Sequence, residues 1–282
     1  MYSPSRRPAE IQRRLLRWYA RCGRDLPWRR TRDPYAVLVS EVMLQQTQVS
    51  RVLPAYAAFL ERFPTLARLA DASLGDVLRV WGRLGYPRRA RDLQRAARLA
   101  RAGLPSGREA LDALPGVGRY TAGAVACFAH GRDEAFADTN IARVLGRAVL
   151  GAPADARAGE ALDAALLPAG GSARWHHALM DLGATVCTAR APRCTECPLA
   201  DICVAYRRGA VPVPVARRQA AFRTSDRRVR GEILRVLRGR PEGTSLGALT
   251  RAIGDSRVPV LVAALAEEGL LERAGRRVRL PA

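Results

Sequence analysis

The stretch that decides the fold runs from Leu114 to Asp138 and reads L-P-G-V-G-R-Y-T-A-G-A-V-A-C-F-A-H-G-R-D-E-A-F-A-D. Its beginning predicts a tight turn, because Gly116 and Gly118 tolerate backbone conformations that other residues avoid. A helix is expected from about Arg119, and the N–H groups of its first turn would face that turn. Such a terminus binds phosphate through its N–H groups and its dipole. The stretch therefore indicates a helix–turn–helix element suited to a nucleic-acid backbone, although G-V-G alone is also compatible with plain helix packing.

Two carboxyl groups lie where chemistry could use them. Asp138 directly precedes a second predicted helix over residues 141–150 and could be an ordinary N-cap. Glu41 lies in the middle of a helix predicted to begin at Asp33-Pro34, on its apolar face. A buried carboxyl group favours its protonated form and can then donate a proton. The alternative for Glu41 is a partly exposed position at the edge of the core.

The composition favours a polyanionic partner. The chain has 282 residues with 47 basic and 26 acidic side chains, which gives a net charge of +21. Such an excess points first to nucleic acid and second to an anionic membrane surface. The sequence shows neither a membrane-spanning run nor a leader. We therefore expect a cytoplasmic protein that binds nucleic acid and no membrane. A monomer associated with the nucleoid is expected as well.

The basic residues are all arginine, and the chain contains no lysine. Without a side-chain amine, no Schiff base can form between a side chain and a sugar aldehyde. Lysine-based covalent catalysis is therefore excluded.

Apolar residues at three- and four-residue spacing predict an all-α core. An N-terminal helix carries Ile11, Leu15 and Trp18 on one face, and the further predicted helices cover residues 51–63, 73–83, 87–102 and 107–113. No strand pattern precedes the C-terminal end. The turn at Tyr86 offers an aromatic ring that either inserts between bases or packs between helices.

Four of the six cysteines form a C-x6-C-x2-C-x5-C pattern, namely Cys187, Cys194, Cys197 and Cys203. Thiols clustered in this way indicate a metal site rather than disulfides in a cytoplasmic protein. Four thiolates can hold zinc or an iron–sulfur cluster. Zinc sites usually pair two short knuckles, and only one close pair is present here. The spacing therefore favours a [4Fe–4S] cluster.

Taken together, these segments resemble the helix–hairpin–helix (HhH-GPD) DNA glycosylases that carry an iron–sulfur cluster, and in particular the MutY family of adenine glycosylases. The matching segments are S-E-V-M-L-Q-Q-T-Q-V at 40–49, L-G-Y at 84–86, L-P-G-V-G-R-Y-T-A-G-A at 114–124, D-T-N-I-A-R-V-L at 138–145, A-L-M-D-L-G-A-T-V-C at 178–187 and the four-cysteine spacing. They span about residues 10–205. Endonuclease III differs over E-V-M-L-Q-Q-T and has a catalytic lysine where this chain has Tyr120.

The resemblance implies base excision repair, in which the enzyme flips adenine out of double-stranded DNA at a mispair with 8-oxoguanine or guanine. Glu41 would protonate the adenine ring so that it can leave. Asp138 would stabilise the sugar cation that remains, as in glycoside hydrolysis. Tyr120 would form a hydrogen bond near Glu41. Since the chain lacks lysine, the glycosylase would be monofunctional.

The resemblance also assigns binding residues. Those expected to hold the DNA backbone or to contact the orphaned base are Gly116, Val117, Gly118, Gln46, Thr47 and Tyr86. Those expected to line the adenine pocket are Trp28, Arg29 and Asp181, for which a core or surface position is the alternative. The cluster would be held by the four clustered cysteines.

Two departures from the family pattern keep other functions open. Thr139 follows the catalytic aspartate, where MutY proteins usually have glycine. A mismatch thymine or uracil glycosylase is therefore the first alternative. The second alternative is a non-catalytic iron–sulfur DNA-binding regulator, which the presence of both Glu41 and Asp138 disfavours.

The C-terminus is the second departure, because family members commonly carry a larger β-rich domain that reads 8-oxoguanine. Here residues 206–225 look like a Pro/Arg linker, and residues 226–282 predict three helices and a β-hairpin that resemble a winged helix. The predicted core has an iron–sulfur lobe, residues 1–25 with 139–205, and a barrel lobe with the hairpin, residues 26–138. Residues 204–282 hold 17 arginines against seven acidic residues, so this end could contact DNA.

Overall fold

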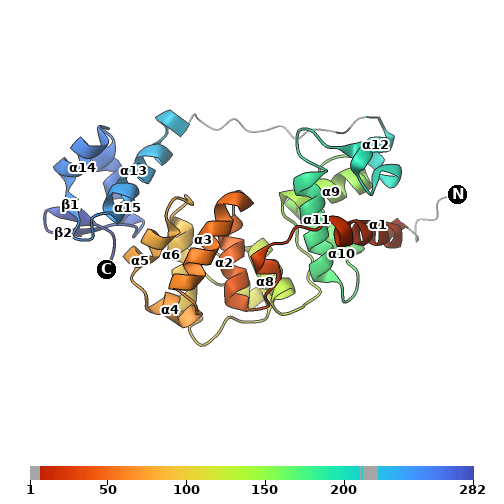
Figure 1. Cartoon of the computed structure of the whole chain (residues 1–282), viewed down its shortest axis with the longest axis horizontal. Coiled ribbons are helices and arrows are strands. Elements are labelled where there is room, and N and C mark those ends of the chain that lie inside the picture. Colours follow the sequence, from red (N-terminus) through yellow and green to blue (C-terminus); the bar gives the residue numbers. More distant parts are fainter. Residues whose placement is uncertain (1–6, 210, 212–221) are drawn as a thin grey trace. The chain divides into compact units, whose positions relative to one another are not determined.

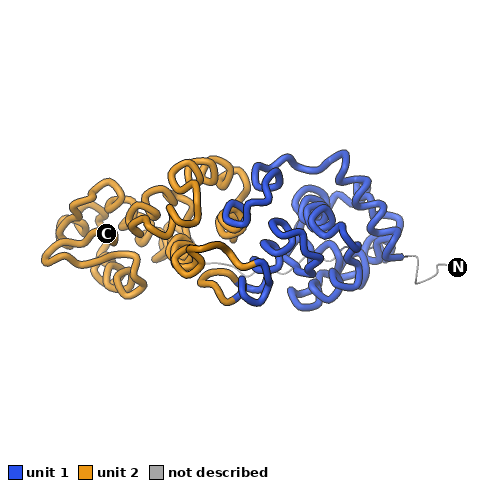
Figure 2. Tube along the Cα trace, turned by 90° about the horizontal axis from the view of Figure 1, so that it is seen from below, with its two compact units in different colours: residues 1–37, 106–112, 118–216 blue, residues 38–105, 113–117, 217–282 orange. Residues whose placement is uncertain are grey.

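A computed structural model of the chain describes residues 7–209, 211 and 222–282. The chain forms two compact units, which Figure 2 colours separately. Unit 1 comprises residues 1–37, 106–112 and 118–216, and unit 2 comprises residues 38–105, 113–117 and 217–282. The predicted all-α core is confirmed. The predicted domain boundaries stay a prediction, and most of the predicted linker lies outside the described residues.

Unit 1 is built around helices that come from both ends of its sequence. Its elements are α1 (Arg7–Cys22), η2 (Pro27–Arg29), α7 (Arg108–Asp112), α8 (Arg119–Phe128), α9 (Thr139–Leu145), the π-helical η3 (Gly146–Leu150), α10 (Ala156–Leu166), α11 (Ser172–Thr185), η4 (Cys194–Glu196), η5 (Ala200–Ile202) and α12 (Val204–Arg207). Helix α11 packs against both α1 and α9, and the three bury Leu15, Leu145 and Trp175 in one core (Figure 1). This core fixes the start of α9, where Asp138 lies.

Helix α2 (Pro34–Leu44) is buried almost completely. Asp33 caps it, since its carboxylate accepts a 3.1 Å hydrogen bond from the N–H of Tyr35. Every residue from Tyr35 to Met43 is buried, including Glu41. The sequence predicted one apolar face, but the helix is enclosed all round, as expected for a helix that is apolar on every side except at Ser40 and Glu41.

The first part of unit 2 is a set of short helices, α3 (Val49–Arg62), α4 (Leu66–Asp71), α5 (Leu74–Trp81) and α6 (Arg88–Leu99). The hydroxyls of Thr65 and Ser73 cap α4 and α5 by accepting backbone hydrogen bonds of 3.2 and 3.0 Å. Helix α4 was not predicted from the sequence, because one and a half turns carry too little periodicity.

The second part of unit 2 is the C-terminal module, residues 222–282. It contains η6 (Phe222–Thr224), α13 (Asp226–Arg238), β1 (Thr244–Ser245), α14 (Leu246–Ile253), α15 (Val258–Glu267), β2 (Glu272–Ala274) and β3 (Arg277–Arg279). The strands form one antiparallel sheet in the order β1-β3-β2. This arrangement confirms the predicted winged-helix-like domain; only the two-residue β1 was missed. Among the described residues, no helix combines the length and the hydrophobicity of a membrane span.

Candidate active site and cysteine loop

The two glycines of the hairpin turn have different roles. Gly116 has a φ of 74°, and a Cβ atom there would lie 2.8 Å from the Cβ of Asp92, so only glycine fits. Gly118 has an ordinary φ of −95°, and a Cβ there would meet nothing within 4 Å. Of the two glycines expected to allow a tight turn, only Gly116 adopts a backbone conformation that other residues avoid. Gly118 caps α8 without a side chain, which leaves the N–H groups of that terminus open to an anion. Val117, between the two glycines, is buried.

Asp138 is the N-cap of α9. One carboxylate oxygen accepts hydrogen bonds from the N–H groups of Asn140 (2.8 Å) and Ile141 (2.7 Å), and the other accepts from the Asn140 side-chain amide (2.8 Å). These three hydrogen bonds tie both carboxylate oxygens to the first turn of α9. The side chain is partly buried and held in one orientation.

The segment that leads to Asp138 is held by a buried polar cluster. The Asp163 carboxylate accepts hydrogen bonds from the N–H of Phe136 (3.1 Å) and the indole of Trp175 (2.7 Å), and it lies 2.7 Å from Nε2 of His176. The ring of Phe136 stacks on His176 at 3.8 Å, and Tyr120 meets Phe136 edge-on at 5.5 Å. The cluster therefore links Tyr120 to the segment before Asp138.

A second set of contacts connects Asp138 to the cysteine loop, residues 187–203. The Arg143 guanidinium donates to the side-chain carbonyl of Asn140 (2.7 Å) and to the backbone carbonyl of Cys187 (2.8 Å). Arg147 donates to the Cys187 sulfur (3.4 Å) and to the Thr188 carbonyl (2.8 Å). Burial lowers the pKa of Arg143. Both arginines fasten the loop to α9 and η3.

Arg29 and Asp181, two of the residues expected to line the adenine pocket, are bonded to each other. Each nitrogen of the Arg29 fork donates a 2.8 Å hydrogen bond to a different oxygen of Asp181. Arg24 adds its backbone N–H (2.8 Å) and side-chain Nε (2.7 Å). Burial opposes ionisation of Asp181, but the hydrogen bonds and charges of Arg29 and Arg24 outweigh it, and its pKa lies below the usual range. Trp28, which precedes Arg29 in the sequence, is buried.

Unit 2 carries the other predicted acid. The Glu41 side chain is only 6% exposed on the enclosed helix α2. Desolvation disfavours a charged carboxylate, so this position suits a proton donor. The alternative of a partly exposed edge position is wrong.

Gln46 and Tyr86 share an uncommon backbone conformation. They are the only non-glycine residues of the described chain with positive φ, at 54° and 48°. Strained backbone of this kind concentrates at functional sites. The Tyr86 side chain is 43% exposed, so its ring is available to a partner.

Arg89 ties the loops of Gln46 and Tyr86 together. Its guanidinium donates to the carbonyls of Val42 (2.8 Å), Met43 (2.9 Å) and Gln45 (2.6 Å), to the hydroxyl of Thr47 (3.1 Å) and to the carbonyl of Gly85 (3.2 Å). It also lies 5.3 Å from the ring centres of Trp81 and Tyr86. Burial lowers its pKa to about 10, so it stays charged at neutral pH.

The four cysteines of the loop line one cavity together with Arg147. Burial raises the pKa of the Cys197 thiol to about 12, and burial with the neighbouring Cys187 and Cys203 raises that of Cys194. Such thiols become thiolates when a metal replaces their protons. In the described residues no three side chains group as ligands of a single ion, so the fit to a cluster rests on the shared cavity.

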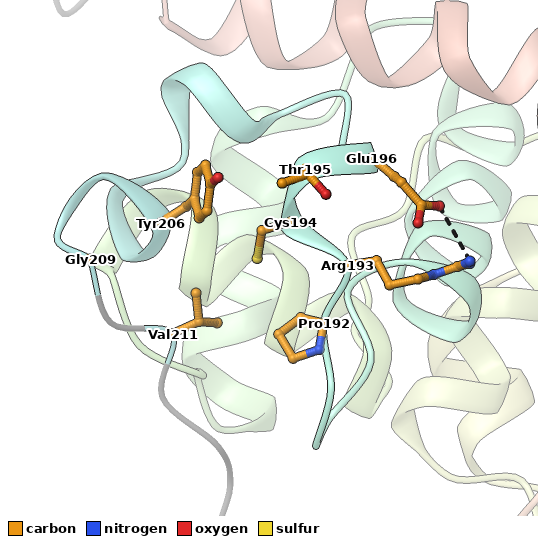
Figure 3. A pocket seen from close by; sticks show the side chains of 8 residues that line it. All are labelled: Pro192, Arg193, Cys194, Thr195, Glu196, Tyr206, Gly209 and Val211. Atoms are coloured by element: carbon orange, nitrogen blue, oxygen red, sulfur yellow. Dashed lines mark ion pairs between the residues drawn. The ribbon is translucent and has the colours of Figure 1, made fainter.

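A larger pocket of about 450 Å³ lies on the outside of this loop (Figure 3). Of the four cysteines, Cys194 alone lines it, and Arg193 and Glu196 form an ion pair of 3.3 Å at its edge. Neither Glu41 nor Asp138 is among its lining residues, so volume alone does not mark the site of base chemistry.

Sequence analysis missed several residues that hold the site. Asn140 and Arg143 lie inside the quoted D-T-N-I-A-R-V-L segment, so that motif was a signal for them. Arg24, Arg89, Asp163 and His176 had no such signal, because their contacts join residues far apart in the chain.

Comparisons with known proteins agree with this geometry. Residues 39–162 match the HhH-GPD superfamily of base excision DNA repair proteins, and residues 187–203 match the iron–sulfur binding domain of endonuclease III. The chain is 47% identical over 233 residues to an adenine DNA glycosylase of Mycolicibacterium smegmatis, covering 79% of each chain. It is 48% identical over 237 residues to one of Mycobacterium tuberculosis, covering 79% of this chain and 77% of the relative. A solved thermostable thymine-DNA glycosylase is 29% identical with a TM-score of 0.67, covering 72% of this chain and 98% of that one.

Proposed function

The chain belongs to the adenine DNA glycosylases, which are base excision repair enzymes, and we propose that it acts on adenine paired with 8-oxoguanine or guanine and leaves the strand uncut. The observation that carries the proposal is the environment of Glu41, a carboxyl group enclosed in an apolar helix. An enzyme that removes adenine needs an acid that is neutral when the substrate binds.

Glu41 is the general acid in this proposal. Adenine leaves readily only after its ring is protonated, and the enclosed Glu41 supplies that proton. Its helix ends just before Gln46 and Thr47, which we assign to the orphaned base with Tyr86. The strained backbone at Gln46 and Tyr86 supports this assignment.

Asp138 is the group that stabilises the developing sugar cation. Its three N-cap hydrogen bonds hold a negative carboxylate in one orientation, so no reorganisation is needed as positive charge forms. We assign Tyr120 a supporting role for the acid, and its ring is positioned by Phe136. Arg29 and Asp181, locked to each other, form part of the adenine pocket with Trp28.

Phosphate contact is assigned to the hairpin turn. The open N-terminus of α8 at Gly118 presents backbone N–H groups without a competing side chain. Gly116 and the buried Val117 shape the turn that presents them.

The enzyme contains an iron–sulfur cluster, and we assign Cys187, Cys194, Cys197 and Cys203 as its ligands in a [4Fe–4S] centre. Bound by these four cysteines, the cluster would cross-link the two ends of the cysteine loop. Arg143 and Arg147 then connect that loop to the helix that Asp138 caps.

Thr139 keeps a thymine or uracil target as the second candidate, since a thymine-DNA glycosylase is among the similar structures. The higher identity to two adenine enzymes favours adenine. We also propose that the enzyme is a monomer that works in the cytoplasm on nucleoid DNA.

The test is a panel of labelled duplexes in which the target base and the opposite base both vary. Adenine release opposite 8-oxoguanine or guanine is expected, with strand breaks only after alkali because the chain has no lysine. Release of thymine or uracil instead would establish the second candidate. Breaks without alkali, trapped by borohydride on a side chain, would refute the monofunctional mechanism. Tight DNA binding with no base released would favour the regulator.

A further inference from the structure

The arginines of the C-terminal module differ in whether they form ion pairs. Five are ion-paired with acidic residues of unit 2, namely Arg228, Arg230, Arg235, Arg257 and Arg279. Three others, Arg273, Arg276 and Arg277, lie exposed on the β2–β3 hairpin and have no acidic partner among the described residues. The turn between the strands is made by Gly275, with a φ of 59°. This hairpin, residues 272–279, is the wing, and its positive charge is free for an external partner.

The third helix of the module, α15, lacks the chemistry of a groove-reading helix. Its exposed face carries Pro259, Val260, Ala263 and Glu267, and Val260 is 72% exposed. Helices that read base edges present Arg, Lys, Asn or Gln. Arg257, just before α15, is already paired with Asp226 and Asp255, both at 2.9 Å. The usual helix-in-groove mode of a winged helix is therefore not supported here.

The module is fastened to α5 and α6 of the same unit. Glu268, at the end of α15, forms a two-pronged ion pair with Arg88 at 2.6 and 2.8 Å and a second pair with Arg230 at 2.5 Å. The Arg88 hydrogen bond is the main cause that lowers the pKa of Glu268 to about 2. On α5, the N–H of Gly75 donates a 2.8 Å hydrogen bond to the carbonyl of Pro281.

These contacts give the wing a fixed relation to the strained Tyr86 loop. Arg88 follows Tyr86 by two residues and is the first residue of α6. The ion pair with Glu268 therefore lies directly after the Tyr86 loop. At Gly75, a Cβ would come within 2.5 Å of the Pro281 carbonyl, which shows how closely the module packs there. The residues on both sides of the wing, Glu268 and Pro281, are therefore bonded to α6 and α5.

We propose that the wing binds the phosphate backbone of duplex DNA beside the mispair, through Arg273, Arg276 and Arg277, while α15 stays out of the groove. The proposal rests on the proposed function, since Tyr86 marks where the duplex is engaged. Guanidinium groups suit phosphate because their planar fork can donate two hydrogen bonds. Backbone contacts carry no sequence information, which fits an enzyme that must scan any sequence.

The test uses the full-length protein and a duplex without a mispair. In R273Q/R276Q/R277Q, affinity is expected to fall by between about two- and thirtyfold at low salt. The slope of log K against log salt should shrink by roughly 0.9 for each phosphate that the variant no longer neutralises. The control R223Q/R235Q/R251Q removes three exposed arginines elsewhere in the module, of which Arg235 is paired with Glu232, and should change both quantities much less. The charge-keeping R273K/R276K/R277K should recover most of the affinity, which separates the loss of charge from misfolding.

A further variant examines α15 itself. Val260→Glu places a carboxylate on its most exposed position, and binding should be unchanged if the helix stays out of the groove. Three results would each overturn the proposal. They are weaker DNA binding in V260E, an equal loss of affinity in the two glutamine triples, and no loss of affinity in R273Q/R276Q/R277Q. Adenine release by the parent protein is followed separately, at saturating enzyme. If the wing variants bind DNA normally, the wing proposal fails, but adenine release by the parent protein is unaffected. If the parent protein releases no adenine, the proposed function fails, and the binding comparison still tests the wing.

Discussion

The guanidinium of Arg89 lies 5.3 Å from the centre of the Tyr86 ring, with the same group bonded to the backbone around Gln46. The two non-glycine residues with left-handed backbone in the described chain are thus held by one partly buried side chain. Left-handed conformations cost free energy and persist only where their surroundings enforce them. Arg89 supplies that enforcement in unit 2.

Replacing Arg89 by alanine should therefore loosen both loops. We expect a loss of about 1–3 kcal/mol of stability from the unsatisfied carbonyls, together with weaker binding to mispaired DNA. The matched control is Arg98→Ala, on the same helix, which also removes bonds to backbone carbonyls, those of Ala70 and Ala72. Thermal unfolding and single-turnover adenine release separate the effects. If the two variants lose the same stability and release adenine at the same rate as each other, Arg89 has no positioning role.

The hairpin glycines should respond differently to substitution. Gly116→Ala meets both a left-handed backbone and the Asp92 side chain, and should cost at least about 1–3 kcal/mol. Gly118→Asp has room and provides a good N-cap, so the unfolding temperature should hold or rise. Its carboxylate would occupy the anion position, and DNA affinity should fall roughly tenfold or more. Unchanged affinity in G118D would exclude this helix terminus as a phosphate site.

The catalytic assignment predicts large kinetic effects with the fold retained. Glu41→Gln removes the proton that adenine needs. Asp138→Asn keeps an oxygen that can still accept the Asn140 and Ile141 hydrogen bonds, yet it cannot offset a cation. Each variant should slow adenine release by at least roughly 10²–10⁴-fold, with duplex binding largely intact. Near wild-type single-turnover rates in both variants would show that these carboxyl groups are not the catalytic pair.

The cysteine loop predicts brown protein with about four irons per chain. Cys197→Ala removes the ligand whose thiol is most strongly affected by burial, and should lose iron and visible absorbance. Cys22→Ala, at the exposed end of α1, is the control and should keep both. Iron content and the absorption spectrum decide the matter. A colourless, active protein with one zinc would contradict the cluster assignment.

His177 predicts a sensitivity to acid. Burial, followed by the charge of Arg29, lowers its pKa from 6.5 to about 3, so the folded protein keeps it neutral where the unfolded chain takes up a proton. Stability should therefore be complete above pH 6.5 and fall as the pH drops from 6.5 toward 3. His177→Phe retains a ring that can stack on Phe128 and should flatten that fall. Urea unfolding at several pH values measures it, and equal pH profiles would rule out this histidine as a cause.

The sequence alone was sufficient for features that depend on local pattern. The cysteine spacing, the helix starts at Asp33 and Asp138, and the winged-helix-like end could all be read from it, because caps, turns and periodic apolar faces involve residues close together in the chain. The absence of lysine likewise follows from composition alone.

Only the tertiary structure decided which polar side chains meet. Arg29 finds Asp181 across 152 positions, and Arg143 reaches the carbonyl of Cys187 across 44. The tertiary structure also showed that Gly116 has a left-handed backbone and that Gly118 does not. It separated the ion-paired arginines of the C-terminal module from the exposed arginines of its wing. The reason is physical, since a buried charge must find a partner wherever packing places one, and packing depends on the whole chain rather than on neighbouring residues.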